Sequence, residues 1–190
     1  MPPPTPASAP PSLTLTTPRL QLSAPRLSDA AEIFQSYARS PQVARYLVWT
    51  AHGAPHETEA FLVRCLEGMA AGRAVPFVIR LRAGGELIGM IELRPAGHKS
   101  DLGYVLSQAH WGRGYATEAL RAVVSHAWTM PGMARIWATC DVDNLASARV
   151  LEKAGMLREG LLRAWEMHPG CSARPRDSWC YAITHDGGIA

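Results

Sequence analysis

The sequence predicts an α+β fold with a central mixed, mostly antiparallel sheet of about six to seven strands and helices packed on that sheet. Two observations lead to this prediction. Segments with strand or helix periodicity follow one another in the order strand, helices, three strands, helix, strand, helix, two strands. A turn with glycines at 84 and 85 joins two neighbouring strand segments into a hairpin. A doubly wound parallel sheet would instead alternate strands and helices regularly.

In the first half of the chain, apolar periodicity predicts one strand, three helical segments and the hairpin. Pro18 interrupts the first strand, and Ser28 is expected to cap the first helix. The third helical segment has apolar residues three and four positions apart, which is typical of an amphipathic helix. The expected bounds are 13–22 for the strand, 28–37, 41–47 and 57–69 for the helical segments, and 75–82 and 87–94 for the hairpin.

In the second half, a short strand leads through a glycine-containing loop into a strongly amphipathic helix. A strand, a helix and two final strands follow. Alternation places Ile136, Ala138 and Cys140 on one side of the middle strand, and Asn144 is expected to cap the last helix, which ends at Gly155. The expected bounds are 102–106, 135–142, 160–167 and 178–184 for the strands, and 116–128 and 144–155 for the helices.

Length and composition indicate a single domain. The chain has 190 residues, 47% apolar and 18% charged, which is enough to bury a continuous core. Residues 1–12 are rich in proline and are expected to form a disordered tail, with the domain over 13–184 and a second tail over 185–190. The start lacks the features of a signal peptide, and no apolar run is long enough to cross a bilayer. We therefore expect a cytoplasmic protein.

Charge, cysteines and histidines narrow the classes of partner. The formal net charge of +3 is small, so we expect neither a nucleic-acid nor a membrane partner. The four cysteines show neither a C-x-x-C pair nor the Cys/His spacing of a zinc site, which predicts reduced, mostly buried thiols and no metal. The histidines have no ligand spacing either, and we expect them on the surface or in loops.

The segment most informative about function is 104–119, which is predicted to be a strand, a loop with two glycines and the start of a helix. Gly112 and Gly114 allow the backbone to approach a ligand and to adopt positive φ. The first turn of the helix has unpaired N–H groups at its positive end, which favours a phosphate. The alternatives are a plain helix-entry turn and a dinucleotide-binding turn. The second is disfavoured, because no acidic residue closes a parallel strand about twenty residues later.

The string Trp-Gly-Arg-Gly-Tyr-Ala-Thr-Glu-Ala over 111–119 resembles the acetyl-CoA pyrophosphate loop of the GNAT superfamily, in the branch of the ribosomal-protein N-terminal acetyltransferases. Other segments between 13 and 184 agree with the same branch in order and spacing. They are Thr17-Pro18-Arg19-Leu20, Leu87-Ile88-Gly89, Leu102-Gly103-Tyr104, the stretch from Asp143 to Gly155, and Arg176-Asp177-Ser178 followed by Tyr181. The resemblance implies the GNAT fold, in which two central strands splay apart, and an acetyl-CoA-dependent N-acetyltransferase.

The resemblance also implies where acetyl-CoA binds. The pantetheine arm is expected along Val105 and Leu106, in the gap between the splayed strands. Asn144 matches a family residue that touches this arm, and it can cap its helix at the same time. The pyrophosphate is expected on the backbone N–H groups of Gly112, Arg113, Gly114, Tyr115, Ala116 and Thr117. The side chain of Arg113 either adds positive charge or is simply solvated.

In this family an amine attacks the thioester carbonyl, which requires a base, an oxyanion donor and a proton for the thiolate. Asp101 matches the family's acidic position and is the first candidate base, acting through a water, with Glu92 second; a surface or ion-paired carboxylate is the alternative for each. A backbone N–H near Val105 is the expected oxyanion donor. Many members protonate the thiolate with a tyrosine where this chain has Leu151, so Ser147 is the better candidate here.

The acceptor amine is expected to bind beside the segment 43–49, where Tyr46 and Trp49 are candidate contacts and ordinary aromatic packing is the alternative. The loop 168–176 is longer than is typical and could mark a changed substrate. Branch resemblance favours a protein or peptide N-terminal α-amine as the acceptor. A small amine such as a polyamine or aminoglycoside is the first alternative, although no acidic cluster supports a polycation. CoA binding without turnover is the second. A homodimer agrees with the family.

Overall fold

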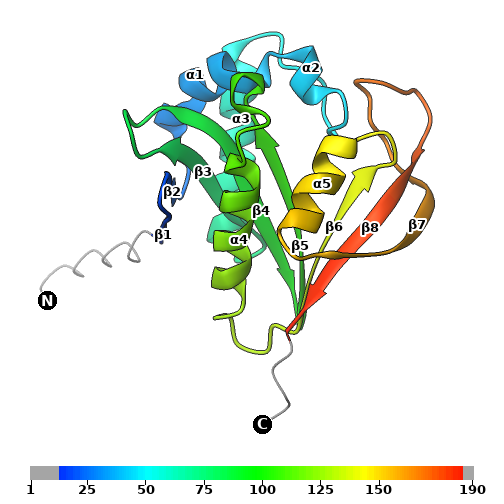
Figure 1. The fold of residues 1–190 in the computed structure, drawn as a ribbon. Helices are drawn as coiled ribbons and strands as arrows, with labels where there is room; N and C mark the ends of the chain where they lie inside the picture. Colours follow the sequence, from blue (N-terminus) through cyan, green and yellow to red (C-terminus); the bar gives the residue numbers. More distant parts are fainter. Residues whose placement is uncertain (1–12, 186–190) are drawn as a thin grey trace, which may run out of the picture.

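In the computed structural model, residues 13–185 are described, and they form one eight-stranded sheet with helices on both faces (Figure 1). The strand order is β1-β2-β3-β4-β5-β6-β8-β7, and all neighbours are antiparallel except β5 and β6. The predicted α+β fold around a mixed, mostly antiparallel sheet is confirmed. The expected tail over 1–12 and residues 186–190 lie outside the described residues.

Most elements fall where the periodicity predicts them. The strands are β1 (Thr14–Thr16), β2 (Leu20–Ser23), β3 (Val75–Leu81), β4 (Leu87–Ala96), β5 (Lys99–Leu106), β6 (Arg135–Asp141), β7 (Leu157–Glu166) and β8 (Arg176–Thr184). The helices are α1 (Ala30–Ile33), which continues as a π-helix over Phe34–Ala38, α2 (Pro41–Ala44), α3 (Pro55–Ala70), α4 (Tyr115–Ala127) and α5 (Leu145–Lys153).

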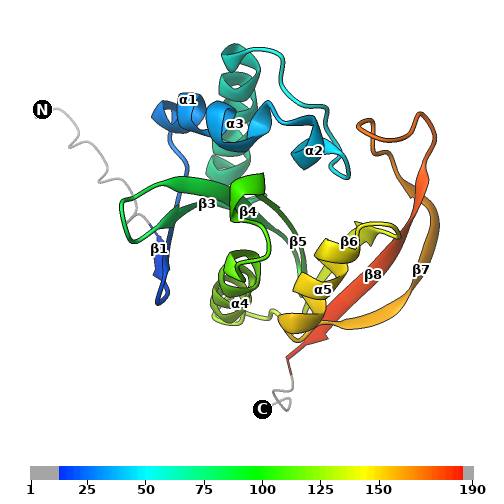
Figure 2. The ribbon, with the colours of Figure 1, turned by 45° about the horizontal axis from the view of Figure 1, so that its top comes forward.

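The sheet separates two apolar cores. Figure 2 shows α1–α3 on one face and α4 and α5 on the other. The larger core joins Leu120 of α4 and Leu151 of α5 to the sheet, and both side chains are fully buried. The smaller core joins Leu62 of α3 to Met90 of β4. Each fully buried leucine contributes about 1.5–3 kcal/mol, so these contacts hold both helical layers on the strands.

The strands β5 and β6 start side by side and then separate. Their parallel ladder pairs only Lys99–Asp101 of β5 with Arg135–Trp137 of β6. Both strands then continue without pairing to each other, β5 to Leu106 and β6 to Asp141. In Figure 1 the two strands diverge toward α2. The predicted splay between the two central strands is therefore confirmed.

Two local predictions near the N-terminus are wrong. Residues 13–22 are not one interrupted strand, because the chain reverses after Thr16 and β1 and β2 pair antiparallel as a hairpin. Ser28 does not cap the first helix. The chain enters this helix through a 3₁₀ turn over Leu27–Asp29, where the Asp29 carboxylate accepts a hydrogen bond from the Arg26 backbone N–H at 2.7 Å. Asp29 is held in place by Arg80 of β3 at 2.8 Å, a long-range contact that periodicity does not show.

Candidate active site

The loop before α4 has the backbone geometry of an anion cradle. Gly112 and Gly114 have φ of +74° and +81°, in the left-handed region that glycine adopts without strain, as predicted. Gly114 is the N-cap of α4, and among residues 13–185 no side chain caps the helix there. The N–H groups of Tyr115, Ala116 and Thr117 thus lie in the first turn without a capping side chain, at the positive end of the helix dipole.

The loop is tied to the end of β5. The indole N–H of Trp111 donates to the backbone oxygen of Leu106 at 2.8 Å. The Arg113 side chain is exposed, so the structure leaves it available to a ligand or to solvent. Because β5 borders the splay, this tie places the anion cradle at the open end of the gap between β5 and β6.

Gly89 permits the tight pairing of β4 with β5 at the open part of the splay. A Cβ atom at Gly89 would lie 2.3 Å from the backbone oxygen of Val105, so only glycine fits. Val105 packs toward the smaller core, whereas Leu106 is buried in the larger one. On the opposite side of the gap, Asn144 caps α5 as predicted, and its side chain accepts from the Ser147 N–H at 3.1 Å.

A pair of hydroxyl groups spans the gap from β5 to α5. The Tyr104 hydroxyl lies 2.8 Å from Oγ of Ser147 and also donates to the Ser147 backbone oxygen at 3.3 Å. Burial raises the pKa of Tyr104, and the hydrogen bond to Ser147 only partly offsets it. Burial likewise raises the pKa of the neighbouring Cys140 thiol to about 11. At neutral pH both groups are protonated, so they can donate hydrogen bonds and do not act as bases.

The two candidate bases lie on the other face of the sheet and share one arginine. Nε of Arg94 donates to Asp101 at 2.7 Å, and its Nη1 donates to Glu92 at 3.0 Å. Burial of Arg94 opposes its charge, but the hydrogen bonds to Asp101 and Glu92 raise its pKa. A Cβ atom on Gly103 would lie 3.3 Å from this guanidinium, so Arg94 extends along β5 toward the gap. The two base candidates therefore form an ion-paired cluster with Arg94.

Trp49 and Tyr46 have different surroundings. A cavity of about 440 Å³ lies between the segment after α2 and the start of α3, and Trp49, His52, Glu57 and Arg64 are among its lining residues. Trp49 also contacts His52, with ring centroids 5.1 Å apart. Tyr46 does not line this cavity, and its ring lies under Arg45 at 5.1 Å. The structure thus brings only the first of the two predicted acceptor contacts to a cavity.

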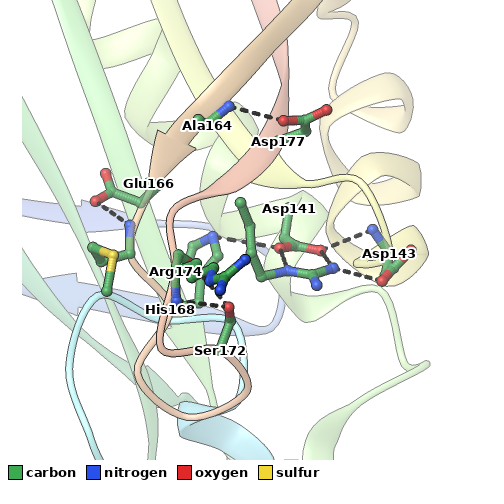
Figure 3. A network of polar contacts seen from close by, with 10 residues as sticks. Asp141, Asp143, Ala164, Glu166, His168, Ser172, Arg174 and Asp177 are labelled. Carbon is green, nitrogen blue, oxygen red and sulfur yellow. Dashed lines mark hydrogen bonds and ion pairs between the residues drawn. The ribbon is translucent and has the colours of Figure 1, made fainter.

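The loop between β7 and β8 closes the same side of the molecule and is held by ion pairs (Figure 3). The fully buried Asp141 side chain accepts from Arg176 at 3.0 Å, and Arg176 also donates to Asp143 at 2.6 Å. Burial alone would raise the pKa of Asp141, but the hydrogen bonds from Arg176 and from the Asp143 backbone lower it. Pro169 of this loop lines the cavity of Trp49. The ion pairs therefore position part of that cavity wall.

His110 corrects the expectation of surface or loop positions, whereas His168 lies in a loop as expected but is buried there. His110 is 6% exposed within a 3₁₀ helix, and His168 is in the loop but only 5% exposed. The Nε2 atom of His168 lies 3.8 Å from Asp141, and neither ring nitrogen has a hydrogen-bond partner within the described part of the chain. No group of three potential metal ligands occurs among residues 13–185. Within that part of the chain, no helix is long and apolar enough to span a membrane.

Sequence reasoning did not single out Tyr104, Arg94 or the Asp141–Arg176 pair as functional. Tyr104 carried a usable signal, because alternation along β5 places it on the face opposite Asp101 and toward α5. Arg94 lies directly opposite Asp101 in the β4–β5 register, which becomes visible only once the hairpin register is known. Asp141 and Arg176 are 35 positions apart and meet through the pairing of β6 with β8.

Comparisons with known proteins agree with this geometry. The family model of the acetyltransferase (GNAT) domain matches residues 19–157. The N-acetyltransferase YoaA of Bacillus subtilis (strain 168) is 35% identical over 114 residues, which are 58% of this chain and 63% of the relative. The ribosomal-protein-serine acetyltransferase of Escherichia coli (strain K12) is 33% identical over 84 residues, 43% of this chain and 47% of the relative. The chain thus spans less than two thirds of either relative.

Two solved structures match a larger part of the chain. RimJ of Mycobacterium smegmatis in complex with CoA-disulfide has a TM-score of 0.79 and 26% sequence identity, over 91% of this chain and 86% of that one. An acetyltransferase of the GNAT family from Bacillus anthracis has a TM-score of 0.78 over 90% of this chain and 98% of that one, at 26% identity. The predicted GNAT fold is confirmed, and the chain belongs to the GNAT family of acetyltransferases.

Proposed function

We propose that this protein transfers an acetyl group from acetyl-CoA to a primary amine, and that the acceptor is the N-terminal α-amine of a protein or peptide. One observation carries the proposal. An uncapped helix start with two left-handed glycines adjoins the open end of a strand splay. The similarity to RimJ in its complex with CoA-disulfide and to the ribosomal-protein-serine acetyltransferase supports the same activity.

The residues of the splay and the loop fit a CoA molecule. The cradle of Gly112 to Thr117 offers N–H donors for a pyrophosphate, and its positive dipole end favours the negative charge. The unpaired part of β5 offers backbone groups to an extended pantetheine arm, because β6 has already diverged there. When bound, acetyl-CoA supplies an electrophilic thioester carbonyl. The backbone N–H near Val105 is the proposed donor to its oxygen.

The amine must lose a proton before it can attack, since an α-amine has a pKa of about 8 and is largely protonated at neutral pH. Asp101 is the first candidate to accept that proton, through a water molecule, and Glu92 is the second. Both carboxylates are held by Arg94, which fixes their positions and also competes for their lone pairs. The Asp101 side chain is 29% exposed, so water can reach it.

The thiolate that leaves requires a proton, and Ser147 is our candidate donor. The hydroxyl of Ser147 can pass its proton to the thiolate and recover one from Tyr104, because the two oxygens are 2.8 Å apart, and Tyr104 then regains a proton from water. Leu151 is fully buried in the larger core and carries no ionisable group, so it takes no part. The proton donors and the base candidates thus lie on opposite faces of the sheet, which separates the entry of the amine from the departure of the thiol.

Release of free CoA thiol tests this function directly. The full chain is incubated with acetyl-CoA and a panel of N-terminal peptides, polyamines and aminoglycosides, and thiol is measured with a chromogenic disulfide. We expect turnover with the peptides that exceeds turnover with the small amines. Turnover with a small amine alone would replace the acceptor while keeping the reaction. CoA binding without thiol release from any amine would contradict the catalytic proposal.

A further inference from the structure

Arg19, in the turn between β1 and β2, contacts the start of α4 through Glu118. Its Nε donates to the Glu118 carboxylate at 2.6 Å, and its backbone N–H donates to the same carboxylate at 2.9 Å. Thr17 adds a third hydrogen bond to Glu118 at 2.6 Å. Burial of Glu118 raises its pKa, but these hydrogen bonds outweigh burial and lower the pKa overall. The carboxylate is therefore charged at neutral pH and neutralises Arg19.

The same guanidinium also contacts the loop that forms the anion cradle. Its Nη1 donates to the backbone oxygen of Arg113 at 3.0 Å, and its Cζ lies 4.5 Å from the centroid of the Tyr115 ring. A Cβ atom on Gly114 would lie 3.5 Å from Nη2 of Arg19. One side chain thus touches three consecutive residues of the loop. We call the set of Arg19, Glu118 and Thr17 the loop brace.

The contact with Arg113 has a consequence for the next N–H group. The carbonyl of Arg113 and the N–H of Gly114 belong to one trans peptide plane, so they point in opposite directions. When Arg19 holds the carbonyl on its own side, the Gly114 N–H is turned away from Arg19. The hydrogen bond from Arg19 therefore fixes the orientation of a donor in the cradle before any ligand arrives.

We propose that Arg19 is a positioning residue for the CoA phosphate loop, and that it acts by preorganising the backbone rather than by attracting the phosphates. This proposal rests on the proposed function, because it assumes that the cradle binds CoA. Glu118 already pairs with the Arg19 charge, which leaves little net charge to attract an anion. A loop that is held in its binding conformation loses less entropy on binding, so the brace should improve CoA affinity while leaving the chemical step alone.

Lysine cannot replace arginine in this arrangement. A lysine at position 19 can pair with Glu118, but it has a single ammonium group and cannot also reach the Arg113 carbonyl and stack on Tyr115 in one planar geometry. Arg19→Lys therefore keeps the charge and the ion pair while losing the contact with the loop. If only charge or fold stability matters, this variant will behave as wild type.

The test combines calorimetric titration of CoA with steady-state kinetics on the full chain. We expect Arg19→Lys and Arg19→Gln to weaken CoA binding by about tenfold, the size expected when a charge-assisted hydrogen bond to a loop is lost. The kcat at saturating acetyl-CoA should stay within about twofold of wild type, because the brace does not touch the reacting groups. The double variant Arg19→Gln/Glu118→Gln should bind CoA almost as well as Arg19→Gln alone, since both substitutions remove the same interaction.

Arg82→Gln is the matched control. Arg82 reaches the same turn and donates to the backbone oxygens of Thr17 and Pro18 at 3.2 Å each. Its effect on CoA binding should be absent, while its effect on the thermal unfolding midpoint should resemble that of Arg19→Gln. Wild-type CoA affinity in Arg19→Lys would overturn the proposed role of Arg19, and so would a loss of CoA affinity in Arg82→Gln equal to that in Arg19→Gln. Neither result would contradict the proposed function. No CoA binding by the wild type would overturn both.

Discussion

The two ends of the proposed active site, the cradle proposed to bind CoA and the proposed acceptor side, are built in different ways. The cradle over 111–117 is continuous in sequence and offers backbone N–H groups, whose directions follow from two positive φ angles. The acceptor side combines Trp49, Asp141 and the loop 167–175, which come from distant parts of the chain and meet through side-chain contacts. Backbone conformation should therefore control CoA binding. Particular side chains should control acceptor binding and the stability of the loop that lines the Trp49 cavity.

The largest effect is expected from a change of backbone conformation in the cradle. Gly114→Val places a β-branched residue at φ +81°, which costs roughly 1–3 kcal/mol or displaces the loop. We expect CoA affinity to fall by roughly 10- to 100-fold in calorimetric titrations. Gly160→Val is the control, because Gly160 has no positive φ and a Cβ atom there meets nothing within 4 Å. Unchanged affinity in Gly114→Val would show that the cradle is not set by its backbone.

On the acceptor side, Asp141→Asn should have the largest effect on stability. Removal of a fully buried carboxylate leaves Arg176 without its main partner, and we expect a loss of about 2–4 kcal/mol in urea unfolding. Asp143→Asn removes an exposed partner of the same arginine and should cost less than about 1 kcal/mol. Equal effects of the two substitutions would mean that burial of Asp141 does not strengthen the ion pair.

The pH dependence of unfolding sharpens the same test. The folded-state pKa of Asp141 is lowered relative to its unfolded value of about 3.9, so its stabilisation is complete above about pH 5. It is lost as the pH falls through the folded-state pKa, because the unfolded chain takes up the proton first. Asp141→Asn should flatten this part of the acid limb. An acid limb identical to that of wild type would assign acid sensitivity to other carboxylates.

The hydroxyl pair at the gap should affect the chemical step and leave binding unchanged. Ser147→Ala and Tyr104→Phe should each lower kcat by about 100-fold, the lower end of the range for a lost general acid. The double variant should be little slower than either single one, because the two hydroxyls form one chain. Leu151→Met is the control, a volume-conserving change in the core. Full activity of Ser147→Ala would remove Ser147 from the mechanism.

The smallest effect is expected at the acceptor cavity. Trp49→Ala should raise the KM for a peptide acceptor by about tenfold, since an aromatic contact and its buried area are lost, while CoA affinity stays the same. Tyr46→Ala should change the acceptor KM less, because Tyr46 does not line the cavity. A larger effect at Tyr46 would move the acceptor site toward the end of α2.

The sequence predicts the cradle better than the acceptor side for a physical reason. The positive φ of Gly112 and Gly114, the start of α4 and the Asn144 cap depend on neighbours in sequence, and all are confirmed. The pairing of Tyr104 with Ser147 and the reversal after Thr16 depend on contacts between distant segments or on a single turn. Residue patterns within a short segment do not show such contacts.

Burial of polar side chains shows the same limit. Spacing arguments exclude metal-ligand patterns among the histidines, but they cannot show that His110 and His168 are enclosed by neighbouring elements. Asp29 likewise accepts a hydrogen bond at the start of the first helix, where its ion pair with Arg80 of β3 holds the carboxylate in place. In each case the position of the side chain follows from the packing of elements that are far apart along the chain.

The most direct test of the central claim follows backbone amide resonances of the full chain during titration with CoA. If the backbone of the cradle binds the pyrophosphate, the amides of Gly112, Gly114 and Ala116 will show the largest saturable shifts, and Gly114→Val will reduce them. Saturable shifts confined to other segments, or no saturable shift at all, would contradict the account.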